Sequence, residues 1–166
     1  MWIWPTKRKF TGSWIGIQNE SYSVDVNLLL YASDQASPRY DEAIQFLLNR
    51  ASDPELFCVC WSTLMAYIRI STHPSIFSHP ISPEEALENI ESLLKQPRVR
   101  VLSEEDGFLE IYHKVSGNFP VRGNLVPDAH IAALLLQHGV RKIYTADSDF
   151  KKFEFLVVKN PFFRKV

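Results

Sequence analysis

Four aspartates at three separated points of the chain have the residue type and the placement for metal chemistry. Asp25 lies near the end of a predicted strand over residues 22–26, and Asp147 and Asp149 directly follow a predicted strand over residues 142–146. In an open parallel sheet, ligands bind beyond the carboxyl ends of the strands. These three carboxylates are therefore expected at one edge of a sheet.

The fourth aspartate, Asp128, occupies the first turn of a predicted helix. Helical spacing puts it on the same face as Ile131, Ala132 and Leu135, which are expected to point into the core. A carboxylate on such a face is costly unless it is paired or bound to a cation. The positive end of the helix dipole is expected to help keep it ionised. Asp128 is thus a further candidate ligand for the same site.

Carboxylates that converge repel one another, and a hard divalent cation removes the repulsion. Mg²⁺ and Mn²⁺ prefer oxygen ligands and leave coordination positions open for water and phosphate. Two such ions roughly 4 Å apart can activate water and stabilise the leaving oxygen in phosphodiester hydrolysis. Taken singly, each aspartate could equally serve as a turn former or as a charge near a helix start. Only the set predicts a metal site.

Short apolar strands alternate with amphipathic helices, which is typical of crossover units with a mainly parallel sheet covered on both faces. Pro38 is expected to open one helix, Ser82 to begin a second with a capping box, and residues 103–106 to cap a third. Gly139 is expected to end the helix that carries Asp128. The predicted strands cover residues 22–26, 56–60, 99–102, 142–146 and 156–158.

The composition is that of a folded globular protein, with 46% hydrophobic and 22% charged residues. The net charge is −1, but without the four aspartates 15 acidic residues face 18 basic ones. A mildly basic remainder is compatible with a polyanionic ligand. Cys58 and Cys60 match no zinc or redox motif and are predicted to be reduced packing residues. No apolar run reaches the length of about 18 residues that a membrane helix needs. These features predict a cytoplasmic protein.

The first twenty residues differ in character from the rest of the chain. We predict that residues 1–20 form an N-terminal extension and that residues 21–166 form a single domain. Three of the four tryptophans lie in the extension, namely Trp2, Trp4 and Trp14. If this segment is ordered, it is expected to pack on the domain or on a partner.

At its acidic motifs the chain resembles the PIN-domain family, and within it the VapC toxins of bacterial toxin–antitoxin pairs. The resemblance covers roughly residues 22–160. It rests on Val24-Asp25-Val26-Asn27, on Pro127-Asp128-Ala129-His130-Ile131-Ala132-Ala133-Leu134 and on Thr145-Ala146-Asp147-Ser148-Asp149-Phe150.

The resemblance implies a three-layer α/β/α fold with a roughly five-stranded sheet and an endoribonuclease that depends on Mg²⁺ or Mn²⁺. It also implies a homodimer and a VapB-like antitoxin that blocks the active site. The matching catalytic aspartates Asp25, Asp128 and Asp147 would bind the metal, with Asp149 either a ligand or a supporting group. Asn27 and Thr145 would support them.

One position departs from the family pattern. The family usually carries a glutamate on the helix after the second strand, and Ala66 stands in that place. Another carboxylate could substitute, with Glu42 as a candidate. The alternative is a catalytically weak module that binds RNA or a protein. Arg69 and Arg122 are candidate contacts for RNA phosphates. A phosphoacceptor domain using Asp25 would need a lysine at another strand end, and no convincing lysine stands there.

Overall fold

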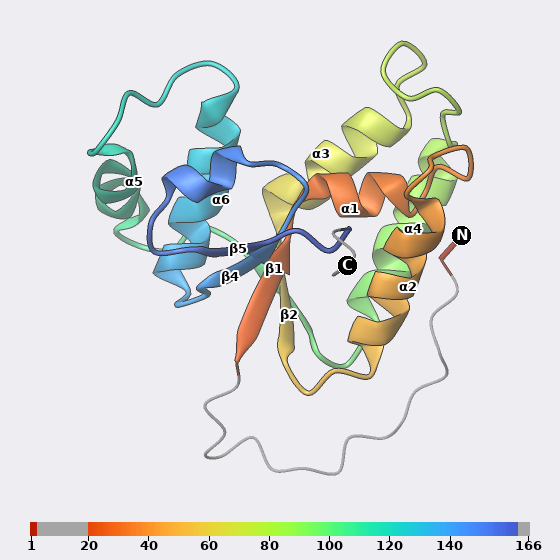
Figure 1. Ribbon diagram of the computed structural model, residues 1–166, viewed down its shortest axis with the longest axis horizontal. Helices are drawn as coiled ribbons and strands as arrows, with labels where there is room; N and C mark the ends of the chain where they lie inside the picture. Colours follow the sequence, from red (N-terminus) through yellow and green to blue (C-terminus); the bar gives the residue numbers. More distant parts are fainter. Residues whose placement is uncertain (3–19, 163–166) are drawn as a thin grey trace.

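The computed structural model describes residues 1–2 and 20–162, and a five-stranded parallel sheet forms its centre (Figure 1). Its strands are β1 (Ser21–Val24), β2 (Leu56–Cys60), β3 (Val99–Leu102), β4 (Lys142–Tyr144) and β5 (Val157–Lys159). They are ordered β3-β2-β1-β4-β5, and every neighbouring pair is parallel. The predicted α/β class and the parallel sheet are confirmed.

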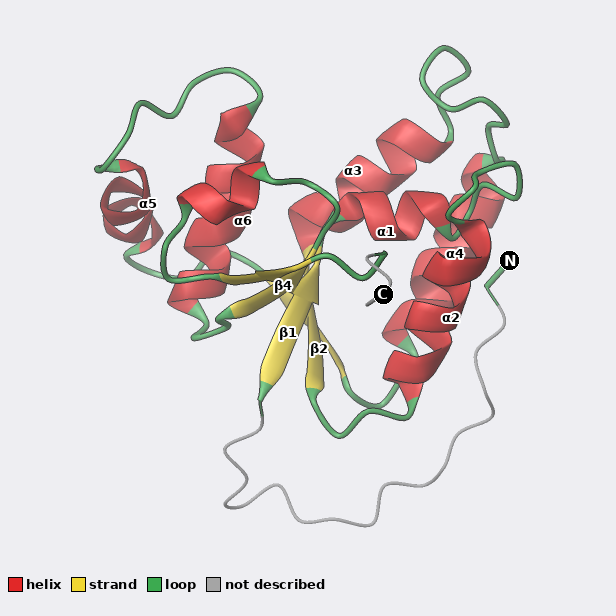
Figure 2. Cartoon of the chain, in the orientation of Figure 1, coloured by secondary structure: helices red, strands yellow, loops and turns green. Residues whose placement is uncertain are grey.

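Helices cover both faces of this sheet, as Figure 2 shows. One layer holds α1 (Val26–Tyr31), α2 (Tyr40–Ala51), α3 (Trp61–Ser71) and α4 (Pro83–Leu94). The other holds α5 (Phe108–Ser116) and α6 (Leu125–Gln137), and the short 3₁₀ helix η1 (Asp149–Lys152) packs on α6. The predicted three-layer α/β/α arrangement is therefore confirmed.

Each face of the sheet has its own hydrophobic core, and the two-residue period of the strands divides side chains between them. In β2, Phe57 and Val59 join the core beneath α1 to α4, whereas Cys58 and Cys60 join the core beneath α6. Both cysteines are buried and free of disulfides. The prediction that they are reduced packing residues is confirmed.

The order of the strands places the candidate site. The chain runs outward from β1 through β2 to β3 and then returns to β4 on the other side of β1. This reversal is the topological switch point at which open parallel sheets bind ligands. Val24 of β1 lies opposite Tyr144 of β4. The residues that follow these strands are therefore neighbours at the carboxyl edge of the sheet.

Two predicted helix starts are wrong. Helix α2 begins at Tyr40 and not at Pro38, because Ser37 to Arg39 form a turn in which the Arg39 N–H donates to Ser37 Oγ over 3.2 Å. Helix α5 begins only at Phe108, after Gly107 with φ +79°. Residues 103–106, predicted as its cap, form a separate loop.

Two predicted helix boundaries are confirmed by their hydrogen bonds. The Glu85 N–H donates to Ser82 Oγ over 3.0 Å at the start of α4. At the end of α6, Gly139 has φ +72°, and the Val140 N–H donates to the Leu135 carbonyl over 2.8 Å. This is a Schellman termination, which needs the left-handed conformation that glycine adopts freely.

The predicted extension lies mostly outside the described residues, but Trp2 is described and is 7% exposed. Its backbone N–H donates to Asn89 Oδ1 over 2.8 Å, and its indole N–H donates to Ser33 Oγ over 3.2 Å. Its ring centroid lies 5.4 Å from that of Tyr67. Trp2 thus packs on the domain, as expected for an ordered segment. In the part of the chain that the structure describes, no helix is long and apolar enough to cross a membrane.

Candidate metal centre

Asp25 joins the central strand to the first helix. Its backbone N–H donates to the Tyr144 carbonyl over 3.0 Å, which continues the pairing of β1 with β4 by one residue. Its side chain caps α1, because Oδ1 accepts the Val26 N–H over 2.6 Å. Asp25 is 7% exposed. The strand ends at Val24, two residues before the predicted end, because Asp25 caps the helix that follows.

Asn27 and Thr145 hold the second oxygen of Asp25. Asn27 Nδ2 donates to Asp25 Oδ2 over 2.5 Å, and the Thr145 hydroxyl donates to the same atom over 2.8 Å. Thr145 Oγ1 in turn accepts from Asn27 Nδ2 over 3.0 Å and from the Asp147 N–H over 2.9 Å. The buried hydroxyl of Thr145 therefore connects Asp25 with the loop that carries Asp147.

The loop after β4 positions two further carboxylates. The Asp149 N–H donates to Asp147 Oδ1 over 2.8 Å, a local turn that aspartate favours. Asp149 then begins η1. Both side chains follow the carboxyl end of β4, where the sequence predicted them.

Three aspartates converge at this edge. One carboxylate oxygen each of Asp128, Asp147 and Asp149 lies within 4.8 Å of the other two; these three residues are called the acidic cluster below. Asp25 is outside this set, although it is close enough to act on the charge of Asp128. The sequence placed all four aspartates in one site, and the structure brings three together with Asp25 beside them.

The negative charges of the site repel one another. Burial raises the pKa of Asp128 to about 6, and the negative charges of Asp25, Asp147 and Asp149 add to the rise, whereas Lys152 lowers it. Desolvation and three neighbouring carboxylates therefore act against the ionised form of Asp128, and the expected help from the helix start stays a prediction. Burial also raises the pKa of Asp25, against the hydrogen bonds from Thr145 and Val26.

The donor set fits a hard divalent cation. The acidic cluster offers only carboxylate oxygens, without the histidine or cysteine that zinc sites favour. A bound cation would favour the ionised form of Asp128, whose pKa its anionic neighbours raise. The half-buried to exposed positions of the three side chains leave room for water and a ligand beside them.

Lys152 is a member of the site that the sequence reading missed. Its Nζ lies 2.6 Å from Asp149 Oδ1, and both side chains are about half exposed. The spacing from Asp149 to Lys152 is i,i+3, which brings side chains together on one turn of a helix and could have revealed the pair. One lysine offsets only part of the charge of three carboxylates.

The other predicted site residues lie outside the acidic cluster. Ala66 is half-buried on α3, a helix whose sequence contains no acidic residue. Glu42 lies on α2 and is not part of the cluster. Arg69 is exposed in the last turn of α3, and Arg122 is exposed in the loop before α6. Within the described ranges, neither arginine forms an ion pair.

Comparisons with known proteins agree with this geometry. The PIN domain model matches residues 22–156. Ribonuclease VapC48 of Mycobacterium tuberculosis is 39% identical over 142 residues, which cover 86% of this chain and 98% of that protein. Ribonuclease VapC37 of the same species is 30% identical over 131 residues, which cover 79% and 90%.

Solved structures share the fold. VapBC2 from Rickettsia felis bound to a promoter DNA fragment aligns with a TM-score of 0.61 at 16% identity, covering 84% of this chain and 97% of that one. The sarcin-ricin loop cleaving toxin VapC20 of Mycobacterium tuberculosis aligns with a TM-score of 0.59 at 18% identity, covering 79% and 93%. With its aspartates at the switch point of a five-stranded parallel sheet, the chain belongs to the PIN domain family and, within it, to the VapC proteins.

Proposed function

We propose that this protein is a Mg²⁺- or Mn²⁺-dependent endoribonuclease and the toxin of a VapBC-like pair. The observation that carries the proposal is the acidic cluster at the carboxyl edge of β1 and β4, with Asp25 held beside it. The relatives named as VapC ribonucleases support it, because they match nearly their whole length. Residues 21–166 would act as the nuclease domain and residues 1–20 as an extension.

The residues of the site have distinct roles in this proposal. Asp128 and Asp147 hold the cation, and Asp149 either binds it directly or supports it. Asp25 completes the site, and Asn27 and Thr145 fix its carboxylate through the hydrogen bonds described above. When bound, the divalent ion supplies an acidified water and positive charge for the phosphate.

The proposed substrate is RNA, and its phosphates require positive charge near the cluster. Arg122 precedes the first turn of α6, which carries Asp128, and Arg69 lies in the last turn of α3. Both side chains are exposed. Each could therefore contact a phosphate that flanks the bond to be cut.

The proposed partners are a VapB-like antitoxin and a second copy of the chain. The solved VapBC complexes of the same fold support the antitoxin. Three exposed apolar side chains support the homodimer: Trp61 at 46% and Met65 at 51% on one face of α3, and Leu109 at 65% on α5. We propose that the protein works in the cytoplasm, in keeping with two cysteines that form no disulfide.

A cleavage assay on total RNA tests this proposal. The purified protein, freed of antitoxin, should cut RNA with Mg²⁺ or Mn²⁺ and stop cutting when EDTA is added. Asp128→Asn and Asp25→Asn should abolish cleavage while the circular dichroism spectrum stays that of a folded protein. Asp106→Asn, outside the cluster, is the matched control and should cut normally. Full activity of both site variants would rule out the proposed site.

Ala66 favours a second candidate, a catalytically weak PIN-like module that binds RNA or a protein. Helix α3 offers no carboxylate to the site, so the cation would have fewer ligands than in most of the family. Ala66→Glu separates the two candidates. A wild type that cuts RNA supports the nuclease. If the wild type does not cut RNA with either metal but the Ala66→Glu variant does, the result supports the weak module.

A further inference from the structure

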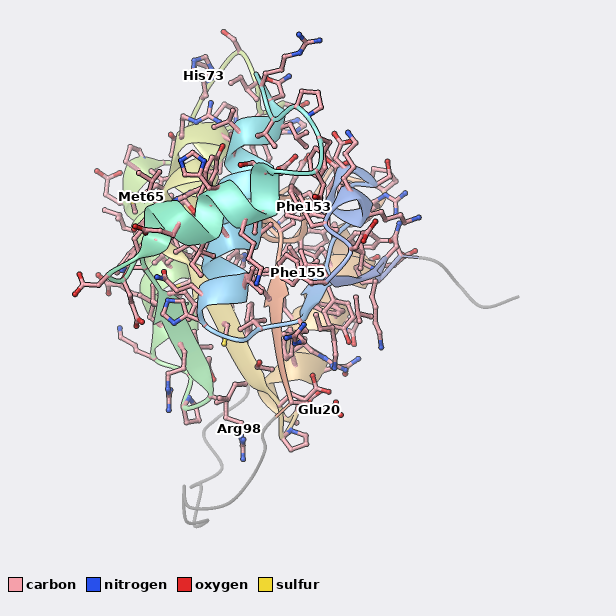
Figure 3. All side chains as sticks on the ribbon, turned by 90° about the vertical axis from the view of Figure 1, so that its left-hand side faces the viewer. Glu20, Met65, His73, Arg98, Phe153 and Phe155 are labelled. Atoms are coloured by element: carbon pink, nitrogen blue, oxygen red, sulfur yellow. The ribbon has the colours of Figure 1, made fainter. Side chains whose placement is uncertain are left out.

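A hollow lies on the face of the molecule formed by α5, α6 and the segment from η1 to β5. Its volume is about 590 Å³, within the range of ligand-binding pockets. The chain segments that enclose it are the end of α5 with the loop after it, the end of α6, the residue before β4, and residues 152–155. Figure 3 looks onto this face, with Phe153 and Phe155 labelled beside α6.

Three cations line this hollow, which we call the aromatic–basic pocket. Lys114, Arg141 and Lys152 are exposed, and Glu154 is the acidic residue beside them. Within the described part of the chain, Lys114 and Arg141 form no ion pair. The pocket therefore presents positive charge that the protein itself does not neutralise, and it favours an anionic ligand.

Aromatic rings supply the floor and one wall of the pocket. Phe153 is buried, and its ring centroid lies 5.5 Å from that of Phe119. Phe119 and Phe155 are partly exposed where they line the hollow. Partly exposed rings next to cations form the combination that binds single-stranded nucleic acid, because bases stack on the rings while the cations meet the phosphates.

Lys152 connects the pocket to the acidic cluster. Its side chain lines the pocket, and its Nζ lies 2.6 Å from Asp149 Oδ1. A strand of RNA that has one phosphate at the cluster can therefore pass Lys152 and enter the pocket. Among the described residues, none lines both the cluster and the hollow around Trp2, whose lining comes from residues 1–2, the loop after α1 and helices α2 and α4.

We propose that the aromatic–basic pocket is a substrate subsite that holds an unstacked base of the single-stranded RNA flanking the bond to be cut. Phe155 and Phe119 provide the stacking surface, and Lys114 and Arg141 contact the adjoining phosphates. Lys152 lies between the two sites and guides the backbone from one to the other. This subsite rests on the proposed ribonuclease function and adds where the rest of the substrate lies.

RNA fits the pocket better than an acidic peptide does. A peptide would use the cations alone, whereas RNA uses both the cations and the rings in an alternating pattern of phosphate and base. Lys152, which lines the pocket, also contacts Asp149 of the site at which a phosphate must be placed. A protein ligand is therefore treated as the competing outcome of the test.

The binding test uses full-length protein with Asp128→Asn in every sample, so that the RNA stays intact. A short fluorescein-labelled single-stranded RNA of mixed sequence is titrated and followed by anisotropy. Phe155→Leu keeps an apolar side chain but removes the ring, and it should weaken binding roughly ten-fold. Lys114→Ala with Arg141→Ala should lower the slope of log K against log salt by about 1.4, at about 0.7 for each phosphate contact. Lys95→Ala, at the end of α4 in the opposite helix layer, removes a positive charge away from the pocket and is the control that should change neither quantity.

A kinetic test separates this subsite from the catalytic site. With Asp128 intact, the pocket variants should raise KM for RNA by a similar factor and leave kcat near the wild-type value. If the wild type cuts RNA but both pocket variants keep its RNA affinity, salt slope and KM, the proposed subsite is wrong and the proposed ribonuclease function stands. Loss of binding to a partner protein with unchanged RNA binding would overturn the subsite in favour of a protein site. A wild type that neither binds nor cuts RNA would overturn the subsite together with the proposed function.

Discussion

Replacing Asp128 by asparagine should make the metal-free protein more stable at neutral pH. Asp128 has a carboxylate that forms no hydrogen bond within the described residues. It faces the negative charges of Asp25, Asp147 and Asp149. Asparagine has nearly the same shape and no charge. The substitution therefore removes the repulsion and sacrifices no hydrogen bond of that side chain.

The magnitude follows from the pKa of Asp128, which burial and the neighbouring aspartates raise from 3.8 to about 6. At about 1.36 kcal/mol for each pKa unit, this difference corresponds to about 3 kcal/mol. Solvent screens the half-exposed carboxylate, which reduces the expected effect to about 1 kcal/mol. The folded protein keeps this proton to a higher pH than the unfolded chain does. The free energy of unfolding should therefore fall as the pH rises from about 4 to about 6, and the loss persists above that window.

Urea denaturation in EDTA measures this effect. At about pH 7.5, Asp128→Asn should unfold at a higher urea concentration than the wild type, by about 1 kcal/mol in the free energy of unfolding. Near pH 3.5 the gain should vanish, because the wild-type carboxyl is then protonated in both states. Asp106→Asn should show neither effect. Equal or lower stability of Asp128→Asn at about pH 7.5 would refute the proposed repulsion.

Three further predictions concern the rest of the fold. Trp2→Ala should lower the free energy of unfolding by about 3 kcal/mol, because it empties a buried aromatic site, whereas exposed Leu87→Ala should change it little. Cys58 and Cys60 should stay unreactive towards a thiol reagent at about pH 8 until urea unfolds the protein, since burial raises their pKa values to about 11 and 12. Met65→Glu should convert the proposed dimer to a monomer in analytical ultracentrifugation, and a wild type that is monomeric at high concentration would contradict that interface.

The fold and most of the site could be predicted because the signals were local or topological. Strand β2 reads as a continuous apolar run, and the structure buries four of its five residues. Asp25 and Asp147 stand at strand ends, and the rule for parallel sheets places both at one edge. Asp128 stands on an inward helical face, where burial raises the pKa of its carboxyl group.

The features that the sequence did not predict depend on contacts between distant segments, or on local sequences that can adopt more than one conformation. Asn27 and Thr145 donate hydrogen bonds to Asp25 Oδ2, and Asp25 stays outside the acidic cluster. The sequence alone does not reveal these contacts. Ser37-Pro38 can open a helix or form a turn, and the structure has the turn. Lys152 lies beyond the acidic motif that predicts the site, although its i,i+3 spacing from Asp149 brings the two side chains together.

The central claim is that the acidic cluster binds the ion that RNA cleavage requires. The most direct test measures the initial rate of RNA cleavage against Mn²⁺ concentration for the wild type and for Asp147→Asn. The wild type should be inactive in EDTA and reach a saturating rate as Mn²⁺ rises. Asp147→Asn should need at least roughly ten-fold more Mn²⁺ or fail to cut at all. Replacing a residue that only supports a metal ligand typically lowers metal affinity or activity 10–100-fold, and the loss of a ligand itself should lower it further. Cleavage by the wild type in EDTA, or the same Mn²⁺ dependence in both proteins, would contradict the claim.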